Sequence, residues 1–180
     1  MKIEVKFSGS SLAGFADRVA ALGAQGQVEL ARGLNEAGDL VRTQVRRALK
    51  DQMGVTHYST IVDTTGSRPA TPNGTGVLDY EINASAKGLR IAEFPVSASA
   101  GGPVTAMTWG VPHTFQRSFV TSKRGLLRAR RGAAREPIRT LKGPSPAKEL
   151  VKGQSLHTFE HAVASVVEPV VVRRLARLVP

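Results

Sequence analysis

A single stripe of apolar and small residues near the N-terminus constrains the fold of this chain more than any other feature. The pattern predicts a helix over residues 12–52, weakened near residues 23–26, where two glycines lie. A helix of this length would measure about 60 Å at 1.5 Å per residue. Because that exceeds the core of a small domain, we expect part of the helix to pack on a neighbouring subunit. The stripe recurs at steps of three or four residues, the spacing of one helix face: Phe15, Val19, Leu22, Gly26, Leu30, Leu34, Ala37, Val41, Val45 and Ala48.

Shorter patterns predict strands. Residues 2–7 alternate between charged and apolar side chains, which is typical of a half-buried strand. Three later segments predict strands at residues 80–86, 89–96 and 105–109, the first two joined as a hairpin. Residues 54–78 are rich in Gly, Pro, Ser and Thr, so they predict a long loop between the first helix and these strands.

The C-terminal region predicts a second helix. Apolar residues at helical spacing begin near Ser155, and Pro169 should kink this helix because proline removes a backbone hydrogen bond. The predicted fold class is α+β: a single domain over residues 1–180, in which the long N-terminal helix and the C-terminal helix pack on a small, mainly antiparallel β-sheet with extended loops. No apolar run reaches the roughly 20 residues of a membrane span, so we expect a soluble protein.

The segment from Arg117 to Lys142 is strongly basic, with nine Lys or Arg residues against one acid, Glu136. It cannot form a compact core, because like charges repel and an unpaired Arg is costly to bury. We expect a basic arm or hairpin over residues 117–142, with Leu126 and Leu127 anchoring a short strand. This arm is either solvated or meets something negative, such as an acidic partner subunit, anionic lipid or a nucleic acid.

Aromatic residues lie just before and within this basic segment. Trp109, Phe115 and Phe119 are spaced like packing residues, so we expect them in the hydrophobic core. The alternative is a platform on which nucleic-acid bases stack beside the basic residues.

Patterns that indicate catalysis or metal binding are sparse. The chain has no cysteine, which excludes thiolate zinc ligands and cysteine nucleophiles. Neither the GxSxG nucleophile motif nor a phosphate loop with Lys followed by Ser or Thr occurs. His157 and His161 are four residues apart, the spacing of a two-histidine metal face, but two ligands are too few and a surface position is favoured. We therefore expect no catalytic residue, no metal and no cofactor.

The order of several short motifs resembles a known family of proteins. The helical segment LNEAGDLVRTQVRRAL (34–49) is followed by TWGVPHTFQRSFV (108–120), GLLRARR (125–131), EPIRTLKGPS (136–145) and a terminal helix. In this order the motifs resemble the prophage minor tail protein Z family, the tail-completion proteins of long-tailed bacteriophages. The resemblance covers residues 34–177, and its most telling parts are PIRTLKGPS and the two phenylalanines four residues apart.

The resemblance implies structural work rather than catalysis. Such a protein is made in the host cytoplasm and lies in the virion, in the neck at the head-proximal end of the tail, where it helps to join tail to head. Its implied partners are copies of itself in a ring, expected to be a hexamer, together with tail-terminator or tail-tube proteins and head-closure or connector proteins. The DNA that passes through the channel is a further implied partner, and no membrane is involved.

The basic residues are the ones we expect to touch a partner. The expected contacts, to acidic neighbours or to DNA, are Arg117, Lys123, Arg124, Arg128, Arg130, Arg131, Arg135 and Arg139. The alternative from a different functional class is a nucleic-acid-binding protein that uses the Arg-rich segment 117–142 without any role in a virion.

Overall fold

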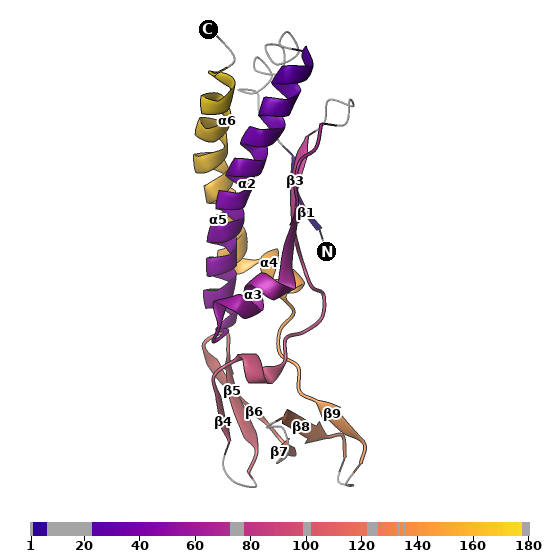
Figure 1. Cartoon of the computed structure of the whole chain (residues 1–180). Helices are drawn as coiled ribbons and strands as arrows, with labels where there is room; N and C mark the ends of the chain where they lie inside the picture. Colours follow the sequence, from indigo (N-terminus) through magenta and orange to yellow (C-terminus); the bar gives the residue numbers. More distant parts are fainter. Residues whose placement is uncertain are drawn as a thin grey trace.

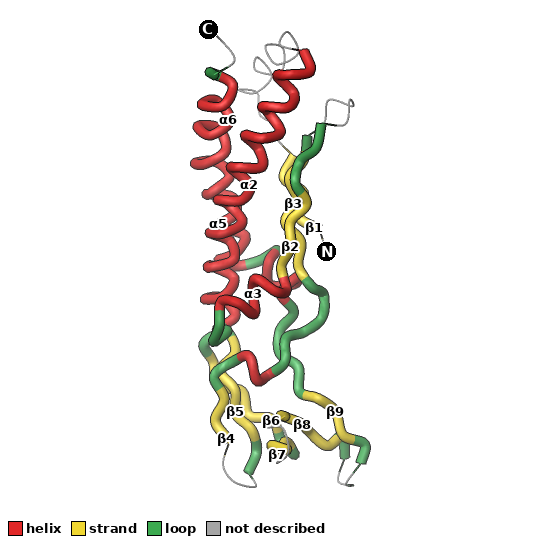
Figure 2. The backbone as a smooth tube through the Cα atoms, viewed as in Figure 1, coloured by secondary structure: helices red, strands yellow, loops and turns green. Residues whose placement is uncertain are grey.

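The computed structural model describes residues 2–6, 23–72, 78–98, 102–121, 126–132, 134 and 136–177. The molecule is elongated, with two long helical columns side by side at one end and two small sheets at the other (Figure 1). A third small sheet lies along the helices (Figure 2). These elements confirm the predicted α+β class, with a long N-terminal helix, a C-terminal helix and antiparallel strands. None of the described helices is both long enough and apolar enough to cross a bilayer.

Helix α2 (Gly23–Met53) is the longest element, about 46 Å at 1.5 Å per residue. Its buried residues follow the predicted stripe, from Leu34 through Val41 and Val45 to Met53. It ends where Gly54 takes a φ of 74°, the left-handed conformation that commonly closes a helix. The predicted helix is therefore confirmed from Gly23 onward, without a break near residues 23–26, and its predicted first turns lie outside the described residues.

The C-terminal helical column packs along α2 (Figure 1). It consists of α5 (Gly153–Ala162), a π-helical turn η2 (Val163–Val167) and α6 (Glu168–Leu175). The π turn lies directly before Pro169, the residue that the sequence predicted would disturb the helix. A wider turn accommodates a proline that has no N–H to donate and whose ring crowds the preceding turn.

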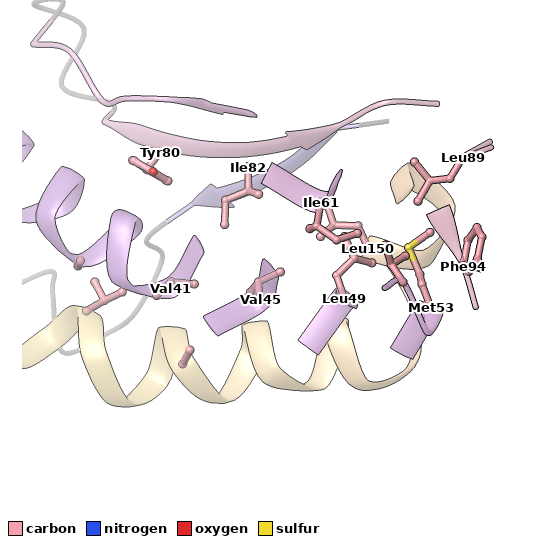
Figure 3. Packing of buried hydrophobic residues seen from close by; sticks show 14 of the residues in the cluster. Val41, Val45, Leu49, Met53, Ile61, Tyr80, Ile82, Leu89, Phe94 and Leu150 are labelled. Atoms are coloured by element: carbon pink, nitrogen blue, oxygen red, sulfur yellow. The ribbon is translucent and has the colours of Figure 1, made fainter. Parts of the chain in front are cut away.

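The sheet beside α2 has the strand order β1-β3-β2 and is antiparallel throughout. Its strands are β1 (Lys2–Lys6), β2 (Thr65–Arg68) and β3 (Asp79–Ala84). From the central strand, Tyr80 and Ile82 point into the core toward the helices (Figure 3). A Cβ at Gly38 would lie 2.5 Å from the Tyr80 ring, so the glycine is what lets the sheet approach α2 this closely.

Two further three-stranded antiparallel sheets form the other end of the molecule, which we call the sheet end. The first contains β4 (Val96–Ala98), β5 (Val104–Thr108) and β6 (Val111–Phe115), and the second contains β7 (Ser118–Thr121), β8 (Leu126–Arg130) and β9 (Ile138–Thr140). Val104 and Leu127 are buried in the same hydrophobic cluster as α2. The sheet end therefore shares one core with the helices.

Short helical turns join the two ends of the molecule (Figure 2). They are α3 (Tyr58–Thr64), the 3-10 turn η1 (Ile91–Glu93) and α4 (Pro146–Leu150). Their side chains Ile61, Ile91 and Leu150 are fully buried in the core cluster. Ile61 and Leu150 lie around the end of α2, close to Leu49 and Met53 (Figure 3).

Two predictions about the middle of the chain were wrong. The predicted loop at residues 54–78 contains α3 and β2, because Ile61 supplies a buried anchor and β3 supplies backbone partners to a strand with no apolar alternation. The predicted hairpin of residues 80–86 with residues 89–96 does not form, since β3 pairs with β1 and β2 instead.

The reason lies in the side-chain spacing of the second half of that hairpin. Leu89, Ile91 and Phe94 are all buried, at steps of two and three residues, whereas strand side chains alternate between faces. A 3-10 turn at Ile91–Glu93 accommodates this spacing. The predicted strand at residues 105–109 is confirmed as β5.

Candidate functional site

The predicted basic arm over residues 117–142 contains the sheet β7-β8-β9, which we call the basic sheet. Strand β8 alternates: Leu127 and Ala129 are buried, which leaves Arg128 and Arg130 on the opposite face. The short strand predicted around Leu127 is confirmed. The apolar residues of β8 anchor the sheet to the core, so they hold its arginines at the surface.

Strand pairing gathers polar and aromatic side chains beside these arginines. Phe119 on β7 and Thr140 on β9 both lie opposite Arg128. The guanidinium carbon of Arg130 lies 5.4 Å from the centre of the Phe119 ring, within the range of a cation–π contact. Phe119, which the sequence assigned to the core, is half-buried and orients an arginine.

A hollow of about 490 Å³ opens beside β7 and the end of β8, and we call it the groove. Its floor and rim are formed by Gly102, Pro103, Gln116, Arg117, Ser118, Phe119, Arg130 and Gly132. Arg117 lies in the two-residue turn between β6 and β7 with a φ of 57°. Its carbonyl accepts a hydrogen bond of 3.1 Å from the backbone N–H of Arg130, so the turn lies beside the end of β8.

The walls of the groove are tied together by Ser118, which is buried. The backbone N–H of Val104 donates to Ser118 Oγ at 2.6 Å, and the hydroxyl donates to the carbonyl of Phe115 at 2.5 Å. These bonds fix the start of β5 against β7. Because the serine hydroxyl is occupied, the polar side chains left to receive a ligand in the groove are Gln116 and the arginines.

In the described part of the chain, the positive charges of the sheet end have no acidic partner. Among the described residues, ion pairs involve neither the groove arginines nor their basic neighbours in the sheet end: Arg117, Arg128, Arg130, Arg131, Arg139 and Lys142. The Nε of Arg128 is buried and has no hydrogen-bond partner there. Lys123, Arg124 and Arg135, which the sequence also predicted as contact residues, lie outside the described residues.

Several arginines along the helices pair with acids instead. Glu36 accepts hydrogen bonds from both Arg173 and Arg174, the latter at 2.8 Å between Nε and Oε2. The Arg174 hydrogen bond holds the pKa of the Glu36 carboxyl below its ordinary value. Arg42 similarly pairs with Asp39 at 3.0 Å. Unbalanced positive charge is therefore concentrated at the sheet end.

Trp109 does not lie in the core, contrary to the sequence prediction. It is 44% exposed and occupies the two-residue turn between β5 and β6, with a φ of 53° followed by Gly110 at 72°. Positive φ at both positions is typical of a type I′ hairpin turn. The indole meets the ring of His113 edge-on, with centroids 5.8 Å apart, and Val111 beside it is 52% exposed.

No constellation in the described part of the chain is suited to metal binding. His157 and His161 are exposed on α5, as the surface interpretation predicted, and the described residues hold no group of three or more His, Asp or Glu placed to share an ion.

The most buried carboxylate, Glu149, belongs to a structural network. Gln52 Nε2 donates to Glu149 Oε2 at 3.1 Å, Lys152 pairs with it at 2.9 Å, and Ser155 donates to Gln52 Oε1. Burial favours the neutral acid, but hydrogen bonds from Lys152, Gln52 and Trp109 outweigh it and lower the pKa of Glu149. A satisfied, ionised carboxylate of this kind holds α2, α4 and α5 together.

Sequence reasoning found the basic residues of the groove but not its other walls. Gln116, Gly102 and Gly132 carry no charge or motif that marks them. The contact of Phe119 with Arg130 depends on the pairing of β7 with β8, so the sequence alone does not reveal it. Compared with known proteins, the chain matches no protein-family model, no curated protein and no solved structure.

Proposed function

We propose that this chain is a non-enzymatic structural protein of a bacteriophage neck, which completes the head-proximal end of the tail and helps to join it to the head. The observation that carries the proposal is the segregation of charge. On the helices, Arg42, Arg173 and Arg174 pair with acids, whereas the described basic residues of the sheet end have no ion pair. A protein built in this way presents one end to a negative partner and leaves its helices free for other contacts.

Exposed apolar side chains support assembly with other subunits. Several large apolar side chains are exposed at the sheet end, including Val96, Met107, Val111 and Val120. Contacts with further copies in a ring, expected to be a hexamer, would cover such residues.

The proposed neighbours follow from the proposed position of the protein in the phage particle. The ring would contact tail-terminator or tail-tube proteins on one side and head-closure or connector proteins on the other. The protein would be made in the host cytoplasm and found in the virion.

Phage production by complementation tests the proposal. Cells supply either the wild-type chain or a variant with Arg117, Arg128, Arg130 and Arg139 replaced by Gln. A control variant replaces Arg47, Arg68, Lys87 and Lys148, which are exposed basic residues outside the sheet end. We expect separate heads and tails to accumulate with the first variant and intact particles with the control. Normal particles that lack the protein altogether would contradict the proposal, and a single copy per particle would contradict the ring.

The second candidate is a nucleic-acid-binding protein with no role in a virion. The groove with its unpaired arginines favours this candidate as much as the first. The two differ in location: a virion protein remains with particles through density-gradient purification, whereas a free binding protein remains in the lysate.

A further inference from the structure

We propose that the groove binds the sugar–phosphate backbone of DNA, with Arg117 and Arg130 as the phosphate ligands. The inference rests on the proposed function for the source of the DNA, but the binding chemistry belongs to the groove itself. The proposed partner of the sheet end is therefore DNA and not an acidic protein.

The fold places the two arginines close together before any ligand arrives. The backbone of Arg117 is fixed by the tight turn between β6 and β7 and by the backbone hydrogen bond from Arg130. The Arg130 guanidinium lies over the Phe119 ring. Because both side chains are exposed and have no ion pair among the described residues, their donors are available to a ligand. The planar fork of a guanidinium matches the two oxygens of a phosphate.

The lining of the groove favours a phosphate chain over a protein surface. Protein interfaces use apolar or aromatic anchors in their centre. Here Phe119 is the aromatic residue of the lining, and the Arg130 guanidinium lies over its ring. Apart from Ser118, whose hydroxyl is already bonded, Gln116 is the neutral polar side chain, and no acid is among the described residues that line the hollow. The groove therefore offers positive charge and hydrogen-bond donors at its rim.

The positive charge continues beyond the groove. Arg128 precedes Arg130 by two residues on the same face of β8, a separation of about 6.6 Å along the strand. Its Nε is buried without a partner in the described residues, a state that buried polar atoms rarely keep. A ligand with charges repeated along a line, as in a nucleic-acid backbone, can meet these arginines in succession.

The same geometry predicts binding without sequence preference. Reading base edges in the major groove takes a helix or a two-stranded ribbon that carries suitable side chains into it. The groove is a hollow on the protein, so the DNA backbone enters it while the bases remain outside. Contacts of this kind position a duplex but carry no sequence information.

Fluorescence anisotropy with the purified full chain tests the inference. The probes are two labelled duplexes of about 20 base pairs with unrelated sequences, one single strand of the same length, and unlabelled poly-L-glutamate as a competitor of equal charge. The variant is R117Q/R130Q. The control is R47Q/R68Q, which removes the same charge from exposed positions outside the sheet end. Thermal melting of every variant shows that it is folded.

We expect both duplexes to bind wild type equally, with an affinity that falls steeply as salt rises. Loss of two phosphate contacts should reduce the log–log salt slope by about 1.8 and the affinity at 0.1 M salt by roughly 60-fold. The control should lose far less. A stronger affinity for the single strand than for the duplex would assign the groove to single-stranded DNA, which has the same backbone chemistry.

Three results would overturn the inference. They are equal losses in the groove variant and the control, a strong preference for one duplex sequence, and displacement of DNA by poly-glutamate at equal charge. The last would favour an acidic protein as the partner. If DNA binding behaves as expected but the chain is absent from purified particles, the groove assignment stands and the virion proposal fails. If the chain is in particles but does not bind DNA, the virion proposal stands and the groove assignment fails.

Discussion

At the scale of single residues, contacts with backbone and ring atoms decide which positions tolerate change. Gly38 is one such position, because Tyr80 is fully buried over it and its hydroxyl donates to Asp39 at 2.6 Å. This hydrogen bond restrains the ring over the helix. A glycine inside a helix normally destabilises it by up to about 1 kcal/mol relative to alanine, so its presence here has a packing reason.

We predict that Gly38→Ala destabilises the protein although alanine is the better helix former. The added Cβ would lie 2.5 Å from the Tyr80 ring, and overpacking of this kind costs about 1–3 kcal/mol. Gly33→Ala is the matched control on the same helix, since its Cβ would make ordinary contacts at 3.4 Å. The control should be neutral or stabilising. Urea unfolding of both variants measures the difference, and equal stabilisation by both would show that the Tyr80 contact yields.

The lowered pKa of Glu149 makes the stability of the fold sensitive to acid. Its pKa is lowered in the fold from an ordinary value of 4.5, so the ionised form favours the folded state. The stabilisation is complete well above that ordinary value and is lost as pH falls through the lowered pKa. Glu93, whose pKa is also lowered, contributes in the same direction.

We therefore predict that, in the Glu149→Gln variant, the free energy of unfolding falls less steeply as pH decreases below about 5. At pH 7 the substitution should cost about 1–3 kcal/mol, because Gln52 and Lys152 lose a charged partner. Glu160→Gln, at an exposed position on α5, is the control and should leave the pH profile unchanged. Urea unfolding at a series of pH values gives the profiles. A variant profile as steep as that of wild type would contradict the assignment to Glu149.

At the scale of secondary-structure elements, the sequence predicted elements from local periodicity but did not predict which strands pair. The stripe that includes Val41 and Val45 predicted α2 because every member of a helical face lies within one segment. β3 was assigned to the wrong partner because β1 is far away in the chain, and sequence patterns do not say which strands meet. Charge predicted that the arginines of the basic segment stay out of the core, but the burial of Leu127 and Ala129 in that core and the three-stranded form of the segment depend on register.

The basic sheet should be an integral part of the fold and not a detachable arm. Leu127 on β8 is 9% exposed and belongs to the same core cluster as α2, so Leu127→Ala should cost about 2–5 kcal/mol. Val120 lies directly opposite it on β7 and is 46% exposed, so Val120→Ala should cost well under half as much. Chemical denaturation measures both. Equal, small effects would show that the sheet contributes little to the stability of the core.

At the scale of the whole molecule, shape and charge are arranged along the same direction. The helical columns occupy one end, and the basic sheet lies at the other (Figure 1). The sequence predicted a helix too long for a small domain, and that length is what makes the molecule elongated. It did not predict the groove, because the groove arises where a turn, a strand and the start of another strand meet.

We predict a radius of gyration clearly larger than that of a compact protein of this size. A compact chain of 180 residues would have a radius of gyration of about 16 Å. Helix α2 alone is about 46 Å long. Small-angle X-ray scattering on the monomer measures the value. A result near the compact figure would mean that the two ends fold back on each other in solution.

The separation of paired and unpaired charge gives each subunit a permanent electric dipole along its length. In a closed ring with rotational symmetry, the components of these dipoles perpendicular to the axis cancel, and the components along the axis add. If the subunits stand even partly along that axis, the ring gains one strongly positive face and one nearly neutral face. Such a ring would approach a negatively charged partner in one orientation, so the order of assembly would be encoded in electrostatics before any specific contact forms.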